Sequence, residues 1–401
     1  MRPFDARRVL IGVAGGIAAY KTVELARRLR QKGAEVQIIL TENGARFVGP
    51  TTFEAVTARP VRQSMWEKNA LDHIALGAWA DAIVVAPATA NLLAKLANGL
   101  ANDMLSSTLL AAPRRSILAP AMNTRMYEHP ATQRNLERLR EDGHVIVGPA
   151  YGELAEGEEG WGRMVEPEML LAHVGRALEW KTRWRDKKVV VTAGPTWEPV
   201  DTVRFLGNRS SGRMGQAIAA AAWRRGADVV LINGPGHAAT PPELDNVHLV
   251  ESTEQMAEAV NESAADADAI FMVAAVADYR PARPEDRKIR RSEGLTSIEV
   301  EPTADVMAAA AKRARAECVK VAFAVESGED AVESAKRKLR EKGAHLVALN
   351  DPSQPGAAFD VDTNRVSIID AQGGVEELPL LLKTEVADEL LDRAEGFLPG
   401  D

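Results

Sequence analysis

The chain has 401 residues, of which 46% are hydrophobic and 26% are charged, and its formal net charge is -8. This composition is ordinary for a globular protein, and the length allows about two or three domains with separate cores. The negative charge argues against nonspecific binding to nucleic acid or to a membrane surface. No run of about 18 apolar residues is present, so we expect a cytoplasmic protein.

Cysteine and histidine usage limits the chemistry further. Cys318 is the only cysteine, which excludes an intrachain disulfide and a cysteine-cluster metal site. The seven histidines show no HExxH spacing. We therefore expect any metal to be Mg²⁺ that accompanies a nucleotide. Cys318 opens the hydrophobic run CVKVAFAV, where a small buried thiol is the expected role.

The first half of the chain alternates strand-like runs with helical stretches. The runs lie at 9–13, 36–40, 82–86, 116–119 and 145–148. This alternation is typical of a parallel sheet that is covered by helices on both faces. A glycine-rich acidic loop follows at 151–164, and then a helix over about 167–180. We place the domain boundary near Arg185, which gives domains 1–184 and 185–401.

The second half repeats the alternation. Its strand-like runs lie at 189–193, 228–232, 269–275, 320–325 and 345–350, followed by a hairpin over 366–380 and a last helix over 384–394. The predicted fold class is therefore α/β, with two doubly wound, mainly parallel-sheet domains of the Rossmann-like type.

Each half opens on a strand that ends at glycine just before a helix. The first segment is VLIGVAGGIAAYKTVELARRL from Val9, and the second is KVVVTAGPT from Lys188, which leads to NRSSGRMG. Such a loop exposes backbone N–H groups at the positive end of a helix dipole, where an anion binds. The pair predicts two phosphate-handling sites and favours an enzyme with two active sites. A plain turn is the alternative for either segment alone.

Three segments of the first half carry polar residues with possible chemistry, and the two that contain Thr89 and Asn123 follow predicted strands, where open parallel sheets bind ligands. His73 is either a base near neutral pH or a surface histidine that caps a helical turn. Thr89 and Asn91 either bind a phosphate or ring edge or cap the next helix. Asn123 either holds a carboxylate or acts as a cap.

In combination these segments match a known pattern. The first half, with GGIAAYK, DHI, PATAN, PAMNTRM and GELAEGEEGWGRM, resembles the flavin-dependent cysteine decarboxylases, in particular phosphopantothenoylcysteine decarboxylase. The second half is similar to phosphopantothenate cysteine ligase, through TAGPTWEPVDTVRFLGNRSSGRMG, MVAAVADYRP, KIRR, AFAVES and LNDPS. The resemblance spans nearly the whole chain, in the order seen in bacterial bifunctional coenzyme A biosynthesis enzymes.

For the first half, the resemblance implies oxidation of the substrate thiol with FMN as electron acceptor, followed by loss of CO₂. It assigns His73 as the base and Asn123 as the residue that holds the departing carboxylate. A neutral amide suits that role, because a cationic clamp would stabilise the carboxylate and oppose its loss. The flavin site implied by the resemblance consists of Gly15, Thr41, Phe47, Thr89, Asn91 and Ala121.

The chain departs from the family at one position. The family loop usually reads L-A-C-G, with a cysteine that protonates the product, whereas this chain has Glu156 in LAEGEEG. Glutamate can replace that cysteine only when it is protonated, which requires a pKa raised by burial or by neighbouring acids. The alternative is a solvated loop charge, with water or another residue as the proton donor.

For the second half, the resemblance implies that CTP and Mg²⁺ activate phosphopantothenate as an acyl-cytidylate, which cysteine then attacks. Asn208 is matched to the residue that polarises the acyl carbonyl, or it forms a turn or a helix cap before Ser210 and Ser211. Lys288 is matched to the lysine that neutralises charge on the transferring phosphate. The implied nucleotide site consists of Ala274, Asp278, Lys288, Ala304, Asp305, Val306, Met307, Phe323, Lys338 and Lys342.

Three of these residues carry further expectations. Asp278 orients the ribose or the magnesium ion. Lys338 and Lys342 lie four residues apart, so both reach toward the triphosphate or both belong to a solvated basic helix face.

The resemblance also implies a homo-oligomer with trimer contacts in the first domain and dimer contacts in the second. Two other functions remain open from the sequence. One is a flavoprotein cysteine decarboxylase with another substrate, and the other is a noncatalytic flavin-binding regulatory protein. Bound flavin together with CTP-dependent release of pyrophosphate distinguishes the enzyme from the regulatory protein.

Overall fold

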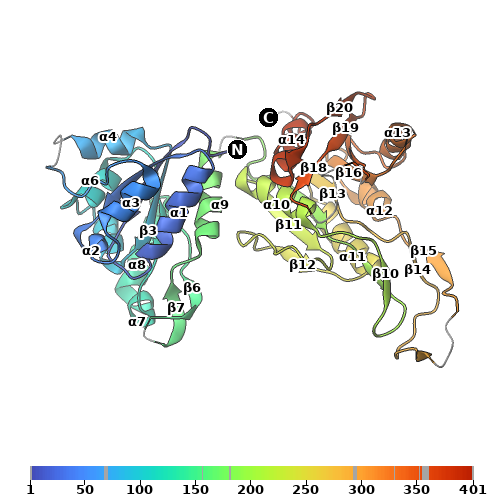
Figure 1. The fold of residues 1–401 in the computed structure, drawn as a ribbon, viewed down its shortest axis with the longest axis horizontal. Helices are drawn as coiled ribbons and strands as arrows, with labels where there is room; N and C mark the ends of the chain where they lie inside the picture. Colours follow the sequence, from blue (N-terminus) through green and yellow to red (C-terminus); the bar gives the residue numbers. More distant parts are fainter. Residues whose placement is uncertain are drawn as a thin grey trace. The chain divides into compact units, whose positions relative to one another are not determined.

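The computed structural model of the chain describes residues 2–66, 71–155, 157–179, 182–291, 296–328, 330–351, 353–354 and 361–399. These residues form two compact units, Met1–Glu179 and Trp180–Asp401. Figure 1 draws the first unit in blue to green and the second in yellow-green to red. Each unit has its own sheet and its own cores, so we describe the units separately.

The first unit places a parallel sheet between two layers of helices. Its strands are β1 (Arg8–Val13), β2 (Glu35–Leu40), β3 (Ala82–Ala88), β4 (Ile117–Pro120), β5 (Val145–Ile146), β6 (Ala150–Glu153) and β7 (Glu159–Arg163). Its helices are α1 (Ala19–Gln31), α2 (Glu42–Ala45), α3 (Pro50–Thr57), α4 (Asp72–Trp79), α5 (Ala90–Ala97), α6 (Met104–Ala111), α7 (Thr124–Glu128), α8 (Pro130–Glu141) and α9 (Pro167–Leu178).

Strand β1 shows why the sheet is buried on both faces. Val9 and Ile11 belong to a core that includes side chains of α1, α3 and α9. Leu10 belongs to the opposite core, with side chains of α5, α6 and α8. Successive side chains of a strand point to opposite faces, so an unbroken apolar run requires helices on both sides.

The strand order in this sheet is β2-β1-β3-β4-β5, and all of its pairings are parallel. The predicted parallel sheet is therefore confirmed. The acidic segment after it differs from the expected loop, because β6 and β7 form an antiparallel hairpin within it. Tyr151 and Trp161 pack edge to face on this hairpin, with ring centroids 5.7 Å apart, and provide an apolar contact that the glycines do not offer.

The second unit has the same layered plan. Its strands are β8 (Lys188–Ala193), β9 (Trp197–Pro199), β10 (Phe205–Gly207), β11 (Asp228–Asn233), β12 (Val247–Leu249), β13 (Ala269–Met272), β14 (Tyr279–Pro281), β15 (Val300–Pro302), β16 (Val319–Val325), β17 (Leu346–Asn350), β18 (Thr363–Asn364), β19 (Val366–Asp370), β20 (Val375–Glu377) and β21 (Leu381–Leu382). Its helices are α10 (Arg213–Arg224), α11 (Thr253–Ala264), α12 (Val306–Arg313), α13 (Ala331–Glu341) and α14 (Lys383–Glu395).

The main sheet of this unit has the order β12-β11-β8-β13-β16-β17-β19-β20. Strands β12 to β17 are parallel, and the predicted hairpin β19–β20 adds antiparallel strands at one edge. Helices α10 and α14 cover one face, and α11, α12 and α13 cover the other. The mainly parallel, doubly wound sheet predicted for this half is confirmed.

One predicted strand of the second unit is shorter than expected. The run at 269–275 forms a strand only over β13, Ala269–Met272. The Thr192 hydroxyl accepts hydrogen bonds from the N–H groups of Val273 and Ala274, at 3.0 and 3.1 Å. This side chain takes the place of a strand partner, so the backbone leaves the sheet at that point.

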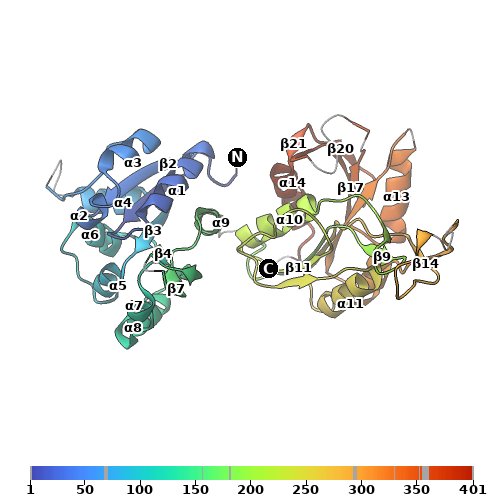
Figure 2. The same ribbon diagram turned by 60° about the horizontal axis from the view of Figure 1, so that its bottom comes forward.

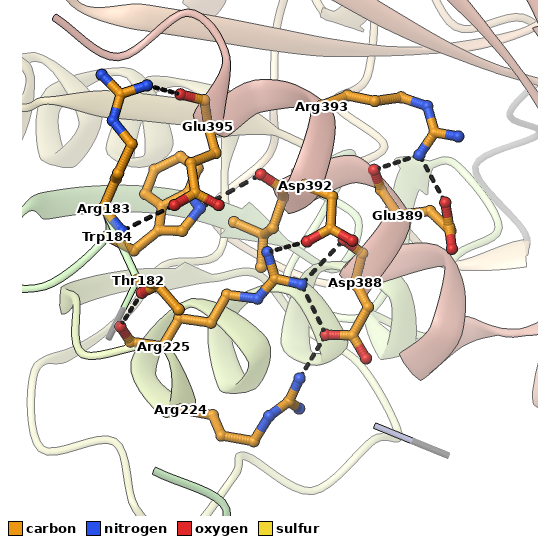
Figure 3. A network of polar contacts seen from close by, with 11 residues as sticks. Thr182, Arg183, Trp184, Arg224, Arg225, Asp388, Glu389, Asp392, Arg393 and Glu395 are labelled. Atoms are coloured by element: carbon orange, nitrogen blue, oxygen red, sulfur yellow. Dashed lines mark hydrogen bonds and ion pairs between the residues drawn. The ribbon is translucent and has the colours of Figure 1, made fainter. Parts of the chain in front are cut away.

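The compact units divide between Glu179 and Trp180, slightly before the expected boundary. Trp184 is fully buried in the core of the second unit, and its indole N–H donates to the Leu391 carbonyl at 3.3 Å. Arg183 donates to the carbonyls of Glu395 and Leu398 at 3.0 and 2.7 Å. Residues just before the second unit's first strand are therefore held by its last helix (Figure 3).

Candidate functional site

The first unit contains a cavity of about 1430 Å³ at the carboxyl end of its sheet. The strand order turns back between β1 and β3, and open α/β sheets bind ligands at such a switch point. The lining comes largely from the segments that follow β1, β2, β3 and β4. A cavity of this size is large enough for a flavin mononucleotide together with a substrate.

The loop after β1 has the properties of a phosphate cradle. A Cβ atom at Gly15 would lie 2.4 Å from the Asn43 Cβ atom, so the close approach of the two loops requires glycine there. The loop leads into α1, which has no acidic residue in its first turn. The positive end of this helix dipole therefore faces the cavity side without a competing carboxylate.

Two expected flavin-site threonines cap helices and also line the cavity. Thr41 caps α2 by accepting the Gly44 N–H at 3.0 Å, and Thr89 caps α5 by accepting the Leu92 N–H at 3.4 Å. The capping alternative is correct for Thr89, but it does not exclude a contact with a ligand. Asn91, which follows β3, and Ala121, which follows β4, were also predicted for the flavin site, and both line the same cavity.

Asn123 caps α7 and also lines the cavity. Its Oδ1 atom accepts the Arg125 N–H at 2.8 Å. The β6–β7 hairpin lies against this segment, because a Cβ atom at Gly162 would come within 2.0 Å of the Met122 carbonyl oxygen. A Cβ atom at Gly160 would similarly overlap the Thr124 hydroxyl, at 2.2 Å. The glycines of the GWGRM segment thus allow the hairpin to cover the PAMNT segment.

Two predicted residues of the first unit, His73 and Phe47, do not line this cavity. His73 lies in the first turn of α4 and is not one of the lining residues. Its Nδ1 atom is buried and has no hydrogen-bond partner among the residues that the structure describes. Phe47 is 49% exposed and also lies outside the lining. Glu156 lies outside the described residues.

Lys21 also lines the cavity, although no role was predicted for it. It is 7% exposed, and its Nζ atom donates to the Met164 carbonyl at 3.0 Å and to the Glu166 carboxylate at 2.8 Å. Arg163 donates to the same carboxylate at 2.8 Å. The hydrogen bond from Lys21 and the nearby charges keep the pKa of Glu166 below its usual value against the opposing effect of burial. This ion pair fastens the end of the β6–β7 hairpin to α1.

A signal for Lys21 was present in the sequence. It belongs to the stripe of α1 that also buries Leu25 and Leu29, at i+4 and i+8. A lysine on the apolar stripe of a helix must find a buried partner, because an unpaired buried charge is costly.

The second unit has its switch point between β8 and β13, and its order matches the 3-2-1-4-5-6 order of dinucleotide-binding sheets. The segments that follow these two strands lie side by side. The Ala275 N–H donates to the Gly194 carbonyl at 2.9 Å, and the Ala277 N–H donates to the Thr196 hydroxyl at 2.9 Å. The predicted nucleotide residues Ala274 and Asp278 belong to this second segment.

Asn208 follows β10 and contacts the same segment. Its side-chain Nδ2 atom donates to the Val276 carbonyl at 2.8 Å. The cap of α10 is Gly212, not Asn208. The structure thus brings Asn208 next to the backbone between Ala274 and Asp278, and the helix-cap alternative is wrong.

The remaining predicted nucleotide residues lie in two other places. Ala304, Asp305, Val306 and Met307 form the start of α12, where Asp305 accepts the Ala308 N–H at 3.0 Å. Lys342 lies 3.7 Å from the Asp305 carboxylate, so the structure joins these two predicted positions. Lys338 donates to Glu326 at 2.6 Å, and Phe323 is half-buried in β16. Lys288 is exposed in the connection between β14 and β15.

Lys338 and Lys342 were predicted either to reach toward the triphosphate or to belong to a solvated basic helix face, and their acidic partners bear on this choice. The hydrogen bond from Lys338 lowers the pKa of Glu326 below its usual value, although burial opposes the shift. Lys338 and Lys342 therefore each contact an acidic side chain, and neither is a purely solvated charge.

The described part of the chain shows no group of three or more His, Cys, Asp or Glu side chains placed to hold a metal ion. Cys318 is 1% exposed, and burial raises the pKa of its thiol to about 11. The expected small buried thiol is confirmed. None of the described helices has the length and apolar character required to span a membrane.

The fold and the two sites define a protein with a flavoprotein-type α/β domain followed by a second nucleotide-binding-type α/β domain. The family model described as "Flavoprotein" matches residues 2–179, and the "DNA/pantothenate metabolism flavoprotein C-terminal domain" matches residues 184–397. The chain belongs to the family of the coenzyme A biosynthesis bifunctional proteins CoaBC.

Relatives with that name cover almost the whole chain. The protein from Bacillus subtilis is 42% identical over 390 residues, which are 96% of each chain. The protein from Escherichia coli K12 is 41% identical over 397 residues, again 96% of each chain. Among solved structures, a PPC decarboxylase mutant complexed with pantothenoylaminoethenethiol is 32% identical, covers 42% of this chain and 96% of its own, and has a TM-score of 0.38.

Proposed function

We propose that this chain is a bifunctional enzyme of coenzyme A biosynthesis. Its C-terminal domain, 185–401, joins phosphopantothenate to cysteine with CTP, and its N-terminal domain, 1–184, decarboxylates the product with FMN. The observation that carries the proposal is the presence of two separate switch-point sites in one chain of this family, on sheets of two different strand orders.

The first site is suited to flavin chemistry. Bound FMN would supply a two-electron acceptor for the substrate thiol and, once CO₂ has left, the hydride that reduces the unsaturated product, so that no external oxidant is needed. Gly15 and the start of α1 hold its phosphate, and Thr41, Thr89, Asn91 and Ala121 surround the remainder of the cofactor. Phe47 belongs to this proposed site only through a second subunit or a bound-state rearrangement, because it does not line the cavity of a single chain.

Two side chains handle the reacting part of the substrate. His73 does not line the cavity of a single chain. Supplied by a neighbouring subunit, it accepts the proton that leaves during oxidation of the thiol. Asn123 holds the carboxylate through the donor end of its amide, since its Oδ1 atom already accepts the Arg125 N–H. A neutral donor leaves the carboxylate free to lose its charge as CO₂ departs. Glu156 then protonates the sulfur-containing product, and this role remains a prediction.

The second site activates a carboxylate. Phosphopantothenate attacks the α-phosphate of CTP, which releases pyrophosphate and forms an acyl-cytidylate. The cysteine amine then attacks the acyl carbon, which forms the amide and releases CMP. Lys288 neutralises charge on the transferring phosphate, Asn208 polarises the acyl carbonyl, and Asp278 orients Mg²⁺ or the ribose. Lys338, Lys342, Phe323 and the start of α12 contact the nucleotide.

The proposal is tested with the purified full-length chain. Supplied with phosphopantothenate, cysteine, CTP and Mg²⁺, it should release pyrophosphate, CMP and CO₂ in equal amounts and carry a flavin absorbance. Flavin without any turnover supports a regulatory flavoprotein instead. CO₂ from a different cysteine substrate, with no pyrophosphate, supports another decarboxylase. A cytoplasmic location and a homo-oligomer also remain predictions.

A further inference from the structure

The turn between β9 and β10 contains a buried carboxylate with an unusual set of partners. Asp201 is 4% exposed. Its Oδ1 atom accepts the N–H groups of Val203 and Arg204, both at 2.8 Å, and so closes the turn. Its Oδ2 atom accepts the N–H of Ile289 at 3.1 Å. One oxygen therefore serves the turn, and the other serves a segment that is distant in sequence.

That distant segment is the connection between β14 and β15, which carries Lys288. Arg204 donates to the Ile289 carbonyl at 2.7 Å, so both backbone groups of Ile289 are held by the same turn. A third bond joins the Glu285 N–H to the Val200 carbonyl at 3.0 Å. Strand β14 also lies beside β9 and β10, as Figures 1 and 2 show from two directions.

The exposure of the side chains at and beside Ile289 agrees with this attachment. Ile289 is half-buried, whereas Lys288 and Arg290 are exposed. The turn therefore contacts Ile289, and the side chain of the preceding residue, Lys288, stays exposed. Holding the N–H and the carbonyl of one residue fixes both flanking peptide planes, and the first of these planes begins at Lys288.

We propose that Asp201 is a positioning residue for Lys288: its carboxylate holds the Lys288–Ile289 peptide while Arg204 holds the next peptide, and together they set the point from which the lysine reaches the nucleotide. This inference rests on the role proposed for Lys288 in cytidylyl transfer. The two bonds to Asp201 Oδ1 are sufficient to close the turn. The bond from Ile289 to Oδ2 and the bond from Arg204 to Ile289 add nothing to the turn, and they are explained by a need to hold the connection between β14 and β15.

The charge state of Asp201 supports this role. Burial by itself would raise its pKa, but three backbone N–H donors and the Arg204 charge hold it below its ordinary value. The carboxylate is therefore ionised at neutral pH and can accept from all three donors at once.

Asp201→Asn separates the two functions of this side chain. The amide keeps an oxygen for the turn but turns an N–H₂ group toward the Ile289 N–H, where two donors repel each other. Because small misplacements of a catalytic group cost up to about a hundredfold in rate, we expect kcat for pyrophosphate release to fall about ten- to hundredfold. The KM for CTP should stay near the wild-type value, since Lys288 acts on charge that develops during transfer.

Asp370→Asn is the matched control. Asp370 closes the β19–β20 turn by accepting the N–H groups of Gln372 and Gly374, both at 2.9 Å. It has the same turn chemistry, but its hydrogen bonds stay within its own turn. This control should retain wild-type pyrophosphate release, and an equal loss in both variants would overturn the inference.

A double-mutant cycle with Lys288→Gln provides the decisive readout. If Asp201 acts through Lys288, the double variant should be no slower than Lys288→Gln alone. Losses that multiply in the double variant would overturn the positioning role, even if each single variant is slow. A wild-type chain that releases no pyrophosphate would instead overturn the proposed function itself, so the two failures are distinguishable.

Hydrogen exchange shows whether the Asp201→Asn variant remains folded. Faster exchange confined to the peptide over 284–291 supports loss of the attachment alone. Faster exchange across the whole second unit would mean that Asp201→Asn disturbs the fold. In that case Arg204→Lys takes the place of Asp201→Asn in the double-mutant cycle, because Arg204→Lys removes the bond to the Ile289 carbonyl and leaves Asp201 in place. An unchanged exchange rate at Ile289 in both variants would contradict the attachment.

Discussion

Thr41, Thr89 and Asn123 each serve two purposes at the first site. Each caps a helix at the carboxyl end of the sheet, and each also lines the cavity. For Thr89 and Asn123 the sequence pattern presented capping and binding as alternatives. At the start of a helix they are compatible, because a cap uses one acceptor and directs the residue toward the same end at which a ligand binds.

Lys21 gives a test at the scale of a single residue. Lys21→Met removes the donor to Met164 and Glu166 but keeps the length of the side chain. Loss of these buried hydrogen bonds should lower the free energy of unfolding of the first unit by about 1 to 3 kcal/mol. Urea denaturation measures this change, and the flavin absorbance of the purified variant reports whether the loosened hairpin weakens cofactor binding.

Lys336→Met is the control for this prediction. Lys336 forms an i,i+3 pair with the exposed Glu333 at 3.0 Å. Such a surface pair contributes only about 0 to 1 kcal/mol. Equal stability of the two variants would show that the Lys21 ion pair contributes no more than a surface contact.

His173 predicts a pH dependence of stability. Burial, with a smaller effect of Arg176, lowers its pKa to about 4 from an ordinary value of 6.5. Below pH 6.5 the unfolded chain therefore binds a proton that the folded chain does not. The free energy of unfolding should fall as the pH decreases toward 4, by about 2 kcal/mol at pH 5 for this group.

The measurement compares urea denaturation at pH 7 and pH 5 for the wild type and His173→Gln. The comparison is needed because the pKa values of His144 and His345 are also lowered by burial and act in the same direction. The variant should lose less stability on acidification than the wild type. Identical losses would show that His173 does not contribute.

At the scale of elements, helices α10 and α14 are joined by buried charges (Figure 3). Arg225 is 2% exposed, and it pairs with Asp388 at 3.2 Å and with Asp392 at 2.8 Å. Arg224 contacts the same Asp388 carboxylate. The two arginines end α10 and the two aspartates lie on α14, so this network connects the first helix of the unit to its last.

Asp388→Ala should be strongly destabilising, because it leaves buried arginine charge without its main partner. We expect the free energy of unfolding to fall by about 3 to 5 kcal/mol. Glu389→Ala is the control on the same helix, since Glu389 pairs with Arg393 at the surface and should contribute about 0 to 1 kcal/mol. Chemical denaturation measures both, and similar losses would argue against a structural role for the buried network.

At the scale of the whole molecule, the boundary between the units can be tested with fragments. A fragment that begins at Thr182 retains Trp184 in its core, whereas one that begins at Asp186 lacks it. Removing a buried tryptophan should cost about 3 to 5 kcal/mol of stability. Urea denaturation of the two fragments checks this, and equal stability would place the start of the second domain after Trp184.

The position of His73 leads to a test of assembly. Within one chain His73 does not line the cavity that contains Asn123. If a neighbouring subunit supplies it, His73→Gln and Asn123→Ala should each be inactive in decarboxylation. Their equimolar mixture should recover about a quarter of the wild-type activity after random subunit exchange. No recovery despite exchange, monitored by native mass spectrometry, would contradict a shared site.

The sequence by itself determined the fold class and the order of the units. Buried strands such as 9–13 and 189–193 are apolar at consecutive positions, and only a sheet covered on both faces buries them. The sequence also placed candidate residues at strand ends, because glycine turns and helix caps depend on residues that are neighbours in the chain.

Tertiary structure decided how distant segments meet. The bonds that Lys21 donates to Glu166 and that the Ile289 N–H donates to Asp201 connect residues that no local pattern relates. The glycines of β7 make a hairpin possible because they lie against the loop after β4, which periodicity does not reveal. Strand order likewise depends on long-range pairing, so the two switch points that define the sites became visible only in the folded chain.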